Sequence, residues 1–121
     1  MNGRRNKNIE AELQTVLDQG GNVWAIGDVH GYAETLSELI ETLNLSSRDR
    51  VVLLGDLVDR GPNSCEVIRI ARENPQIFSV LGNHEEMMLK SFDVENIGMM
   101  TPLQAGWFYI GGRATSLSYI N

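Results

Sequence analysis

The feature that most constrains this chain is an apolar run followed at once by glycine and charged residues. The run Val51–Leu54 precedes the block Gly55–Gly61, which reads Gly-Asp-Leu-Val-Asp-Arg-Gly. Short continuous apolar runs are typical of strands that are buried on both faces of a parallel sheet. The block therefore places two carboxylates and an arginine at the point where a buried strand ends.

Two similar blocks flank the first one. Upstream, the run Val23–Ile26 precedes Gly27–Gly31, which reads Gly-Asp-Val-His-Gly. Downstream, the run Ile77–Leu81 precedes Gly82–Glu85, which reads Gly-Asn-His-Glu. The sequence thus predicts three strands, each with a polar block at its carboxyl end.

The spacing of the blocks matches strand–helix–strand units. Asp28 and Asp56 lie 28 positions apart, and Asp56 and Asn83 lie 27 apart, whereas one such unit takes roughly 30 residues. Parallel strands joined in this way end at the same edge of a sheet, where ligands bind in open α/β folds. We therefore expect the three blocks to form one site.

Apolar residues at helical spacing predict helices between and after the strands. The expected fold class is α/β in the order α-β-α-β-α-β-α-α, with a mainly parallel sheet. The predicted helices cover 9–17, 32–43, a segment from the N-cap Asn63 to before Pro75, a segment from about His84, and 106–120 with a break at Gly111-Gly112. Thr101 and Pro102 form a further helix-start signal, an N-cap followed by proline.

Composition excludes several classes of protein. The 121 residues, 42% of them apolar, suffice for one small domain. The net charge of −6 disfavours nucleic-acid binding, and no apolar run approaches the ~18 residues of a membrane span. Cys65 is the only cysteine, which excludes an internal disulfide and fits a cytoplasmic location. Residues 1–8 lack the apolar run of a secretory signal, and we expect a flexible tail there and the domain over 9–121.

The residue types in the blocks suit a metal site. Asp28 and His30 are two positions apart, so their side chains point the same way in an extended segment. With Asp56 they supply two carboxylates and an imidazole, which suit manganese, iron or zinc better than a thiolate site would. Each block also has an ordinary interpretation as a turn or a helix cap, Asn83 included. Both histidines of the chain lie in the blocks, however, and this coincidence favours a metal site.

The three blocks resemble the signature blocks of the phosphoprotein phosphatase (serine/threonine phosphatase) branch of the calcineurin-like metallophosphoesterases. The similarity extends from Val23 to the end of the chain. The run Glu85–Met88, and Trp107 followed by Gly111-Gly112, resemble the small bacterial and bacteriophage enzymes of that branch. The resemblance implies part of the metallophosphoesterase α/β sandwich, namely its N-terminal portion without the C-terminal half.

The resemblance also implies roles for the metal ligands. Asp28 and His30 would bind a first divalent ion, Asp56 would bridge to a second, and Asn83 would bind the second. The ions would be manganese, with iron or zinc as alternatives. A water or hydroxide bound between the two ions would attack phosphorus directly.

Further roles follow from the same resemblance. Arg60, together with Asn83, would hold the substrate phosphate. His84 would be the general acid, and Asp59 would orient it and raise its basicity. The substrate would be a phosphoprotein or a small phosphoester.

The chain departs from the family pattern in its length. The family supplies two further histidines and a second arginine from a downstream half, whereas this chain has only two histidines. We therefore expect at most one well-held ion and doubtful activity in this chain alone. Without the second sheet, the chain is expected to be marginally stable or to associate through its uncovered sheet face.

Three functions are consistent with these sequence features. The first is a metal-dependent serine/threonine protein phosphatase. The second is a bis(5'-nucleosyl)-tetraphosphatase-type hydrolase, from a sister family that usually lacks the aspartate corresponding to Asp59 and tends to have aspartate in place of Glu85. The third is a non-catalytic metal- or phosphate-binding fragment, which the missing histidines favour. Asp59 and Glu85 favour the phosphatase.

Overall fold

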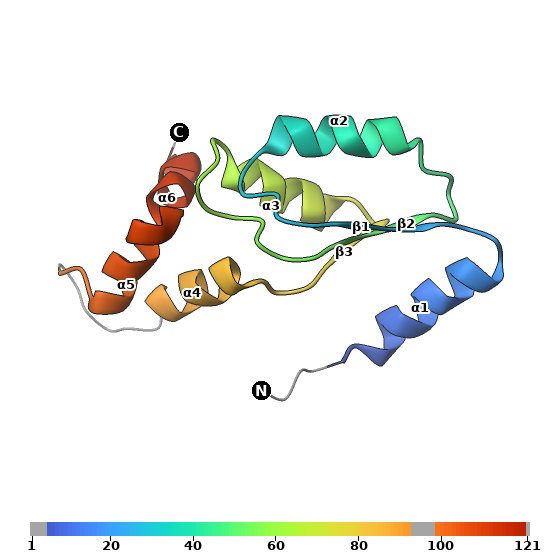
Figure 1. Ribbon diagram of the computed structural model, residues 1–121, viewed down its shortest axis with the longest axis horizontal. Coiled ribbons are helices and arrows are strands. Elements are labelled where there is room, and N and C mark those ends of the chain that lie inside the picture. The colour runs from blue at the N-terminus through green and yellow to red at the C-terminus, as the bar shows by residue number, and fades with distance from the viewer. Residues whose placement is uncertain (1–4, 93–98, 121) are drawn as a thin grey trace.

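The computed structural model describes residues 5–92 and 99–120. Its elements follow the predicted α/β order (Figure 1). They are α1 (Lys7–Asp18), β1 (Val23–Ile26), α2 (Ala33–Leu43), β2 (Arg50–Leu53), α3 (Ser64–Glu73), β3 (Ile77–Ser79), α4 (Asn83–Phe92), α5 (Pro102–Trp107), an irregular turn η1 (Phe108–Gly112) and α6 (Arg113–Ile120).

The first helix begins earlier than predicted. The Asn6 side chain accepts a hydrogen bond from the Ile9 backbone nitrogen at 3.1 Å and caps the helix, which begins at Lys7, two residues before Ile9. Lys7 and Asn8 therefore belong to α1 and not to the predicted tail, of which residues 1–4 lie outside the described residues. None of the helices in the described ranges is long and apolar enough to cross a membrane.

The three strands form a parallel sheet in the order β1-β2-β3. The register pairs Ile26 with Leu53 and Leu53 with Ser79, so all three strands point their carboxyl ends to one edge. Strands β2 and β3 end one and two residues earlier than predicted. The chain turns away from the sheet there, and Leu54 and Leu81 are consequently exposed.

One face of the sheet carries the hydrophobic core. Helices α2 and α3 cover this face (Figure 1). Val51, Leu53 and Ile77 belong to the core cluster between these helices and the sheet, and Val51 and Leu53 are fully buried. They pack against Leu36 of α2 and Val67 of α3. Burial of such side chains is worth roughly 1.5–3 kcal/mol each, so this layer supports the strand ends that carry the polar blocks.

The opposite face is only partly covered. The pleat turns Val52 and Phe78 to this side, and both are half-buried. Beyond the strand ends, Val80 and Leu54 are each 52% exposed. A row of apolar side chains thus remains accessible to solvent in the described part of the chain.

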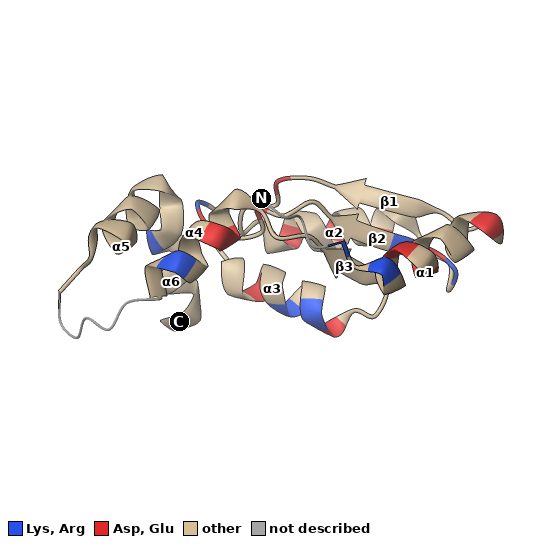
Figure 2. Cartoon of the chain, turned by 90° about the horizontal axis from the view of Figure 1, so that it is seen from below, with Lys and Arg blue, Asp and Glu red and all other residues tan. Residues whose placement is uncertain are grey.

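Local signals account for the helix boundaries. The Asn63 side chain caps α3 through the Glu66 backbone nitrogen at 3.1 Å. Thr101 and Gln104 form a reciprocal capping box at the start of α5. On α3, Arg69 pairs with Glu66 and Glu73, and basic positions lie between an acidic position near each end of that helix (Figure 2). These pairs are exposed and contribute little to stability.

A buried aspartate joins two loops at the amino ends of the strands. The Asp49 carboxylate accepts hydrogen bonds from the backbone nitrogens of Asn22 at 2.8 Å and Ser46 at 2.9 Å. These two backbone bonds lower the pKa of Asp49 below its ordinary value, because they favour the ionised form. The carboxylate therefore fixes where β1 and β2 begin.

This contact predicts a pH-dependent loss of stability. A lowered pKa in the folded state means that Asp49 stabilises the fold fully above about pH 4, the ordinary carboxyl value, and loses that effect as the pH falls through the lower folded value. Asp49→Asn should reduce the free energy of unfolding at pH 7, and the deficit should shrink in acid. Urea unfolding followed by circular dichroism measures this, with the exposed Glu41→Gln as control. An equal deficit at all pH values would contradict the prediction.

The partly covered face predicts self-association. We propose that the isolated chain pairs with a second copy through the face carrying Val52, Phe78 and Val80, because exposed apolar area costs ~25 cal/mol per Å². Analytical ultracentrifugation should show a concentration-dependent dimer that Val80→Lys shifts to monomer. Leu103→Lys, at a residue of α5 that is 55% exposed, is the matched control. A wild-type chain that stays monomeric with a high, sharp melting transition would refute the proposal.

Candidate metal centre and its histidine pair

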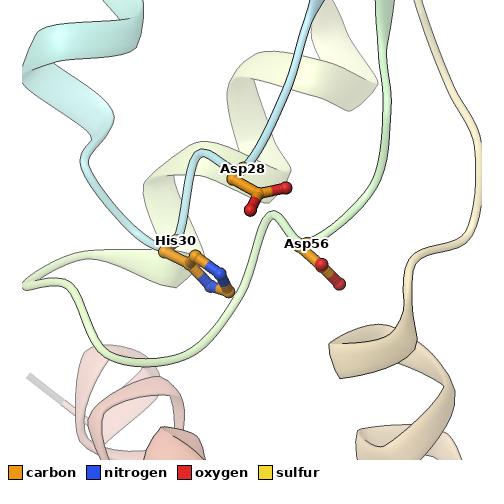
Figure 3. Close-up of side chains that lie close together, drawn as sticks. All are labelled: Asp28, His30 and Asp56. Carbon is orange, nitrogen blue, oxygen red and sulfur yellow. The ribbon is translucent and has the colours of Figure 1, made fainter.

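The loops after β1 and β2 bring three predicted ligands together. Asp28, His30 and Asp56 each offer one ligand atom, and these atoms all lie within 4.8 Å of one another (Figure 3). Asp28 is exposed, whereas His30 and Asp56 are half-buried. Two carboxylates and an imidazole at this separation are a suitable donor set for a divalent cation.

The backbone at the site is strained. Asp28, His30, Asp56, Asp59 and Arg60 all have positive φ, between 43° and 75°. Among the described residues, Asn44 is the only other non-glycine residue with positive φ. Such conformations cost of order 1–3 kcal/mol each and persist only where surrounding contacts enforce them. The site loops must therefore be held by specific interactions.

The Glu85 carboxylate supplies four of these interactions. Its Oε1 accepts from the backbone nitrogens of Asp56 at 2.6 Å and Gly82 at 3.0 Å. Its Oε2 accepts from those of Leu57 at 2.9 Å and Val58 at 3.3 Å. Glu85 is 6% exposed, so this buried carboxylate fastens the loop after β2 to the loop after β3.

Glycine is required where these two loops meet. A Cβ added at Gly82 would overlap the backbone nitrogen and Oδ1 of Asp56. The glycine therefore lets the chain pass close enough for Glu85 to reach the Asp56 loop.

Hydrogen bonds also orient the ligands. His30 Nδ1 lies 2.8 Å from the carbonyl oxygen of Val58. Because a carbonyl only accepts, we assign the ring proton to Nδ1, which leaves Nε2 to face a metal ion. Asp56 Oδ1 accepts from the backbone nitrogen of His84 at 3.0 Å. The three residues therefore fit a divalent cation in both donor type and orientation.

A second, buried pair adjoins the cluster. His84 Nδ1 lies 2.7 Å from Asp59 Oδ2, and Asp59 is fully buried. The His84 ring meets the His30 ring edge to face, with 4.6 Å between ring centroids. Asp59 therefore fixes the orientation of an imidazole directly beside the predicted metal ligands.

Arg60 and Asn83 lie at the rim of the site. Arg60 is exposed; its backbone nitrogen donates to Gly111 O at 3.1 Å and its Nε to Ile110 O at 3.3 Å. Its terminal guanidinium nitrogens are the atoms left to face a ligand. Asn83 is exposed and is the first residue of α4. Their predicted roles in binding phosphate and a second ion stay predictions.

Sequence reasoning missed three residues that support the site. The sequence patterns of Glu85 and Trp107 indicated a resemblance to the family but did not predict that either residue supports the site. Trp107 and Thr115 both contact the Asp59 carboxylate. Of these, only Glu85 had a local signal, since it directly follows His84 in a polar block. Nothing near Thr115 in the sequence marks it.

Comparison with known proteins assigns the class. Residues 21–119 match the family described as Calcineurin-like phosphoesterase, so this chain belongs to that family, as its motifs predicted. Members of this metallophosphoesterase family use divalent metal ions, and the Asp28, His30 and Asp56 cluster is the corresponding candidate site.

The particular relatives fall into two groups. Serine/threonine-protein phosphatase 2 of Escherichia coli is 34% identical over 89 residues, which are 73% of this chain and 40% of that protein. The symmetrical bis(5'-nucleosyl)-tetraphosphatase of Coxiella burnetii is 45% identical over 82 residues, or 67% of this chain and 28% of that protein. The one from Paracidovorax citrulli is 46% identical over 69 residues. The chain thus spans well under half the length of these relatives.

The site predicts a single tight metal ion. Titration of the isolated chain with Mn²⁺, checked by elemental analysis, should give about one ion per chain or fewer, because Asp56 and Asn83 alone compete poorly with water for a second ion. Asp28→Asn should weaken binding by at least the roughly 10–100-fold typical of losing an outer-shell partner. Glu34→Gln, at an exposed residue of the neighbouring helix α2, is the control. Two tightly held ions per monomer would contradict this.

Proposed function

We propose that this chain carries the first metal site, the phosphate-binding arginine and the proton donor of a metal-dependent phosphoric monoester hydrolase. The proposed substrates are phosphoserine and phosphothreonine in proteins. The observation that supports this most is the buried Asp59–His84 pair, whose imidazole meets the ring of His30 in the candidate metal centre.

Each residue has a distinct part in the proposed reaction. A divalent cation at Asp28, His30 and Asp56, manganese with iron or zinc as alternatives, would supply an acidified water and neutralise phosphate charge. Arg60 binds the phosphate oxygens through its terminal nitrogens, and Asn83 binds the same phosphate.

His84 donates the proton. Its Nδ1 is held by Asp59 at 2.7 Å, so the remaining ring nitrogen, Nε2, gives the proton to the leaving oxygen.

The Asp59–His84 pair favours a substrate that is a phosphate monoester of serine or threonine. An alkoxide is a poor leaving group and requires protonation, so a positioned acid contributes strongly to its departure. A nucleoside phosphate is a much better leaving group and needs that proton less. The fully buried Asp59, which fixes His84, therefore fits the phosphatase reaction better.

A second candidate is a dinucleoside tetraphosphate hydrolase. It is supported by the 45% identity to the Coxiella burnetii protein, which exceeds the 34% identity to the Escherichia coli phosphatase. Both reactions use the same cation site and phosphate-binding arginine. Substrate preference therefore separates them.

The proposal predicts how loss of the acid depends on the leaving group. With Mn²⁺ present, His84→Asn should slow hydrolysis of a phosphoserine peptide by roughly 10²–10⁴-fold. Hydrolysis of p-nitrophenyl phosphate should slow much less, because nitrophenolate leaves without a proton. Asp59→Asn should show a weaker version of the same pattern. Steady-state rates of the 121-residue chain on both substrates measure this.

Controls and alternatives can be read from the same assays. Glu86→Gln changes a neighbouring residue that is ion-paired to Lys90 in α4 and should leave the rates unchanged. Mn²⁺ content should be equal in all variants. Equal loss on both substrates would remove His84 from the acid role. Faster cleavage of diadenosine tetraphosphate would favour the second candidate. Metal binding without hydrolysis of any substrate would favour a non-catalytic fragment.

A further inference from the structure

Two side chains from the C-terminal helices reach the carboxylate that holds His84. Trp107 Nε1 donates to Asp59 and lies 3.0 Å from both Oδ1 and Oδ2. Thr115 Oγ1 donates to Oδ1 at 2.7 Å. Each of these two side chains is 2% exposed. The Asp59 carboxylate thus takes three donors, of which His84 is only one.

These contacts fix the direction of the carboxylate as well as its place. Thr115 Oγ1 also accepts from the Asp59 backbone nitrogen at 2.8 Å. The hydroxyl is thus bonded to both the backbone and the carboxylate of Asp59. With Oδ1 held by Thr115 and the indole set between both oxygens, Oδ2 is turned to His84 Nδ1. A carboxylate without these donors would be free to rotate about χ2, a soft torsion.

A break in the helix makes the double contact feasible. In a straight helix Trp107 and Thr115 would lie about 12 Å apart along the axis. Gly111 instead adopts φ 121° and bends the chain between α5 and α6. A Cβ at Gly112 would overlap the Trp107 ring, so the bend is packed directly against the indole.

The same bend also contacts Arg60, the residue that follows Asp59. The Arg60 backbone nitrogen donates to Gly111 O, and a Cβ at Gly111 would lie 2.7 Å from Arg60 Cγ. One turn of chain therefore supports both the residue that orients the imidazole and the arginine at the rim.

We propose that Trp107 and Thr115 are positioning residues of the hydrolase, acting on His84 through Asp59. The catalytic effect of these two residues rests on the proposed function, whereas their contact with Asp59 does not. The indole ring also packs against Phe92 and Phe108, which gives it a separate packing role. Its N–H group, by contrast, is directed at Asp59, and removal of that group alone separates positioning from packing.

The contact is tested without any assay of activity. The chain has two tryptophans, so a ¹H–¹⁵N spectrum shows two indole signals, assigned with Trp107→Phe and Trp24→Phe. Asp59→Asn and Thr115→Val should each shift the Trp107 signal and speed its hydrogen exchange, and Thr115→Ser should restore the wild-type signal. The Trp24 signal should stay in place. A Trp107 signal unmoved by Asp59→Asn would overturn the proposal.

Kinetics test the catalytic role. Trp107→Phe and Thr115→Val should each lower kcat on a phosphoserine peptide by roughly tenfold, a fraction of the ~10²–10⁴-fold due to a general acid. KM and Mn²⁺ content should be unchanged, and p-nitrophenyl phosphate should be affected less. Thr115→Ser should recover the rate, and Trp24→Phe is the matched control.

A double-mutant cycle separates positioning from structure. In an Asp59→Asn background, Trp107→Phe should cause no further loss, because the two changes remove one interaction. A full additional loss in that background would assign Trp107 a merely structural role and overturn the proposal. An inactive wild-type chain would refute the proposed function, and with it the catalytic role, while the indole signal would still decide the contact.

Discussion

The site depends on one buried carboxylate that takes no part in the proposed chemistry. Glu85 gathers four backbone N–H groups from the loops after β2 and β3. Charge-assisted bonds of this kind are about twice as strong as neutral ones. They offset the cost of the positive φ at Asp56, and they keep the loop close to the start of α4. The relative placement of Asp56 and His84 follows from this contact.

Asp59 has the equivalent part on the other side of the site. It joins the loop after β2 to α4 through His84, and to the C-terminal helices through Trp107 and Thr115. The two buried carboxylates thus have different partners: Glu85 binds backbone N–H groups, and Asp59 binds side chains. The loop that carries Asp56 and the imidazole of His84 are consequently fixed by buried carboxylates.

The sequence was sufficient for the parts of the structure that local chemistry dictates. Apolar runs, the N-caps Asn63 and Thr101, and the block spacing predicted the strands, the helix starts and the meeting of Asp28 with Asp56. The sequence was insufficient where contacts join distant segments. Thr115 lies 56 positions from Asp59, and no periodicity or turn signal marks such a pair. Aspartate and histidine adopt positive φ more readily than most residues, but this preference does not show which of them do so in the site, because tertiary contacts decide it.

The bend at Gly111 has a consequence for how this segment can vary in length. Each residue added to or removed from a helix rotates everything beyond it by about 100°. An insertion of one residue between Trp107 and Thr115 would carry the hydroxyl away from Asp59 while leaving every individual side chain unchanged. The number of residues between Trp107 and Thr115 is therefore constrained as well as their identity, and this segment should tolerate insertions poorly.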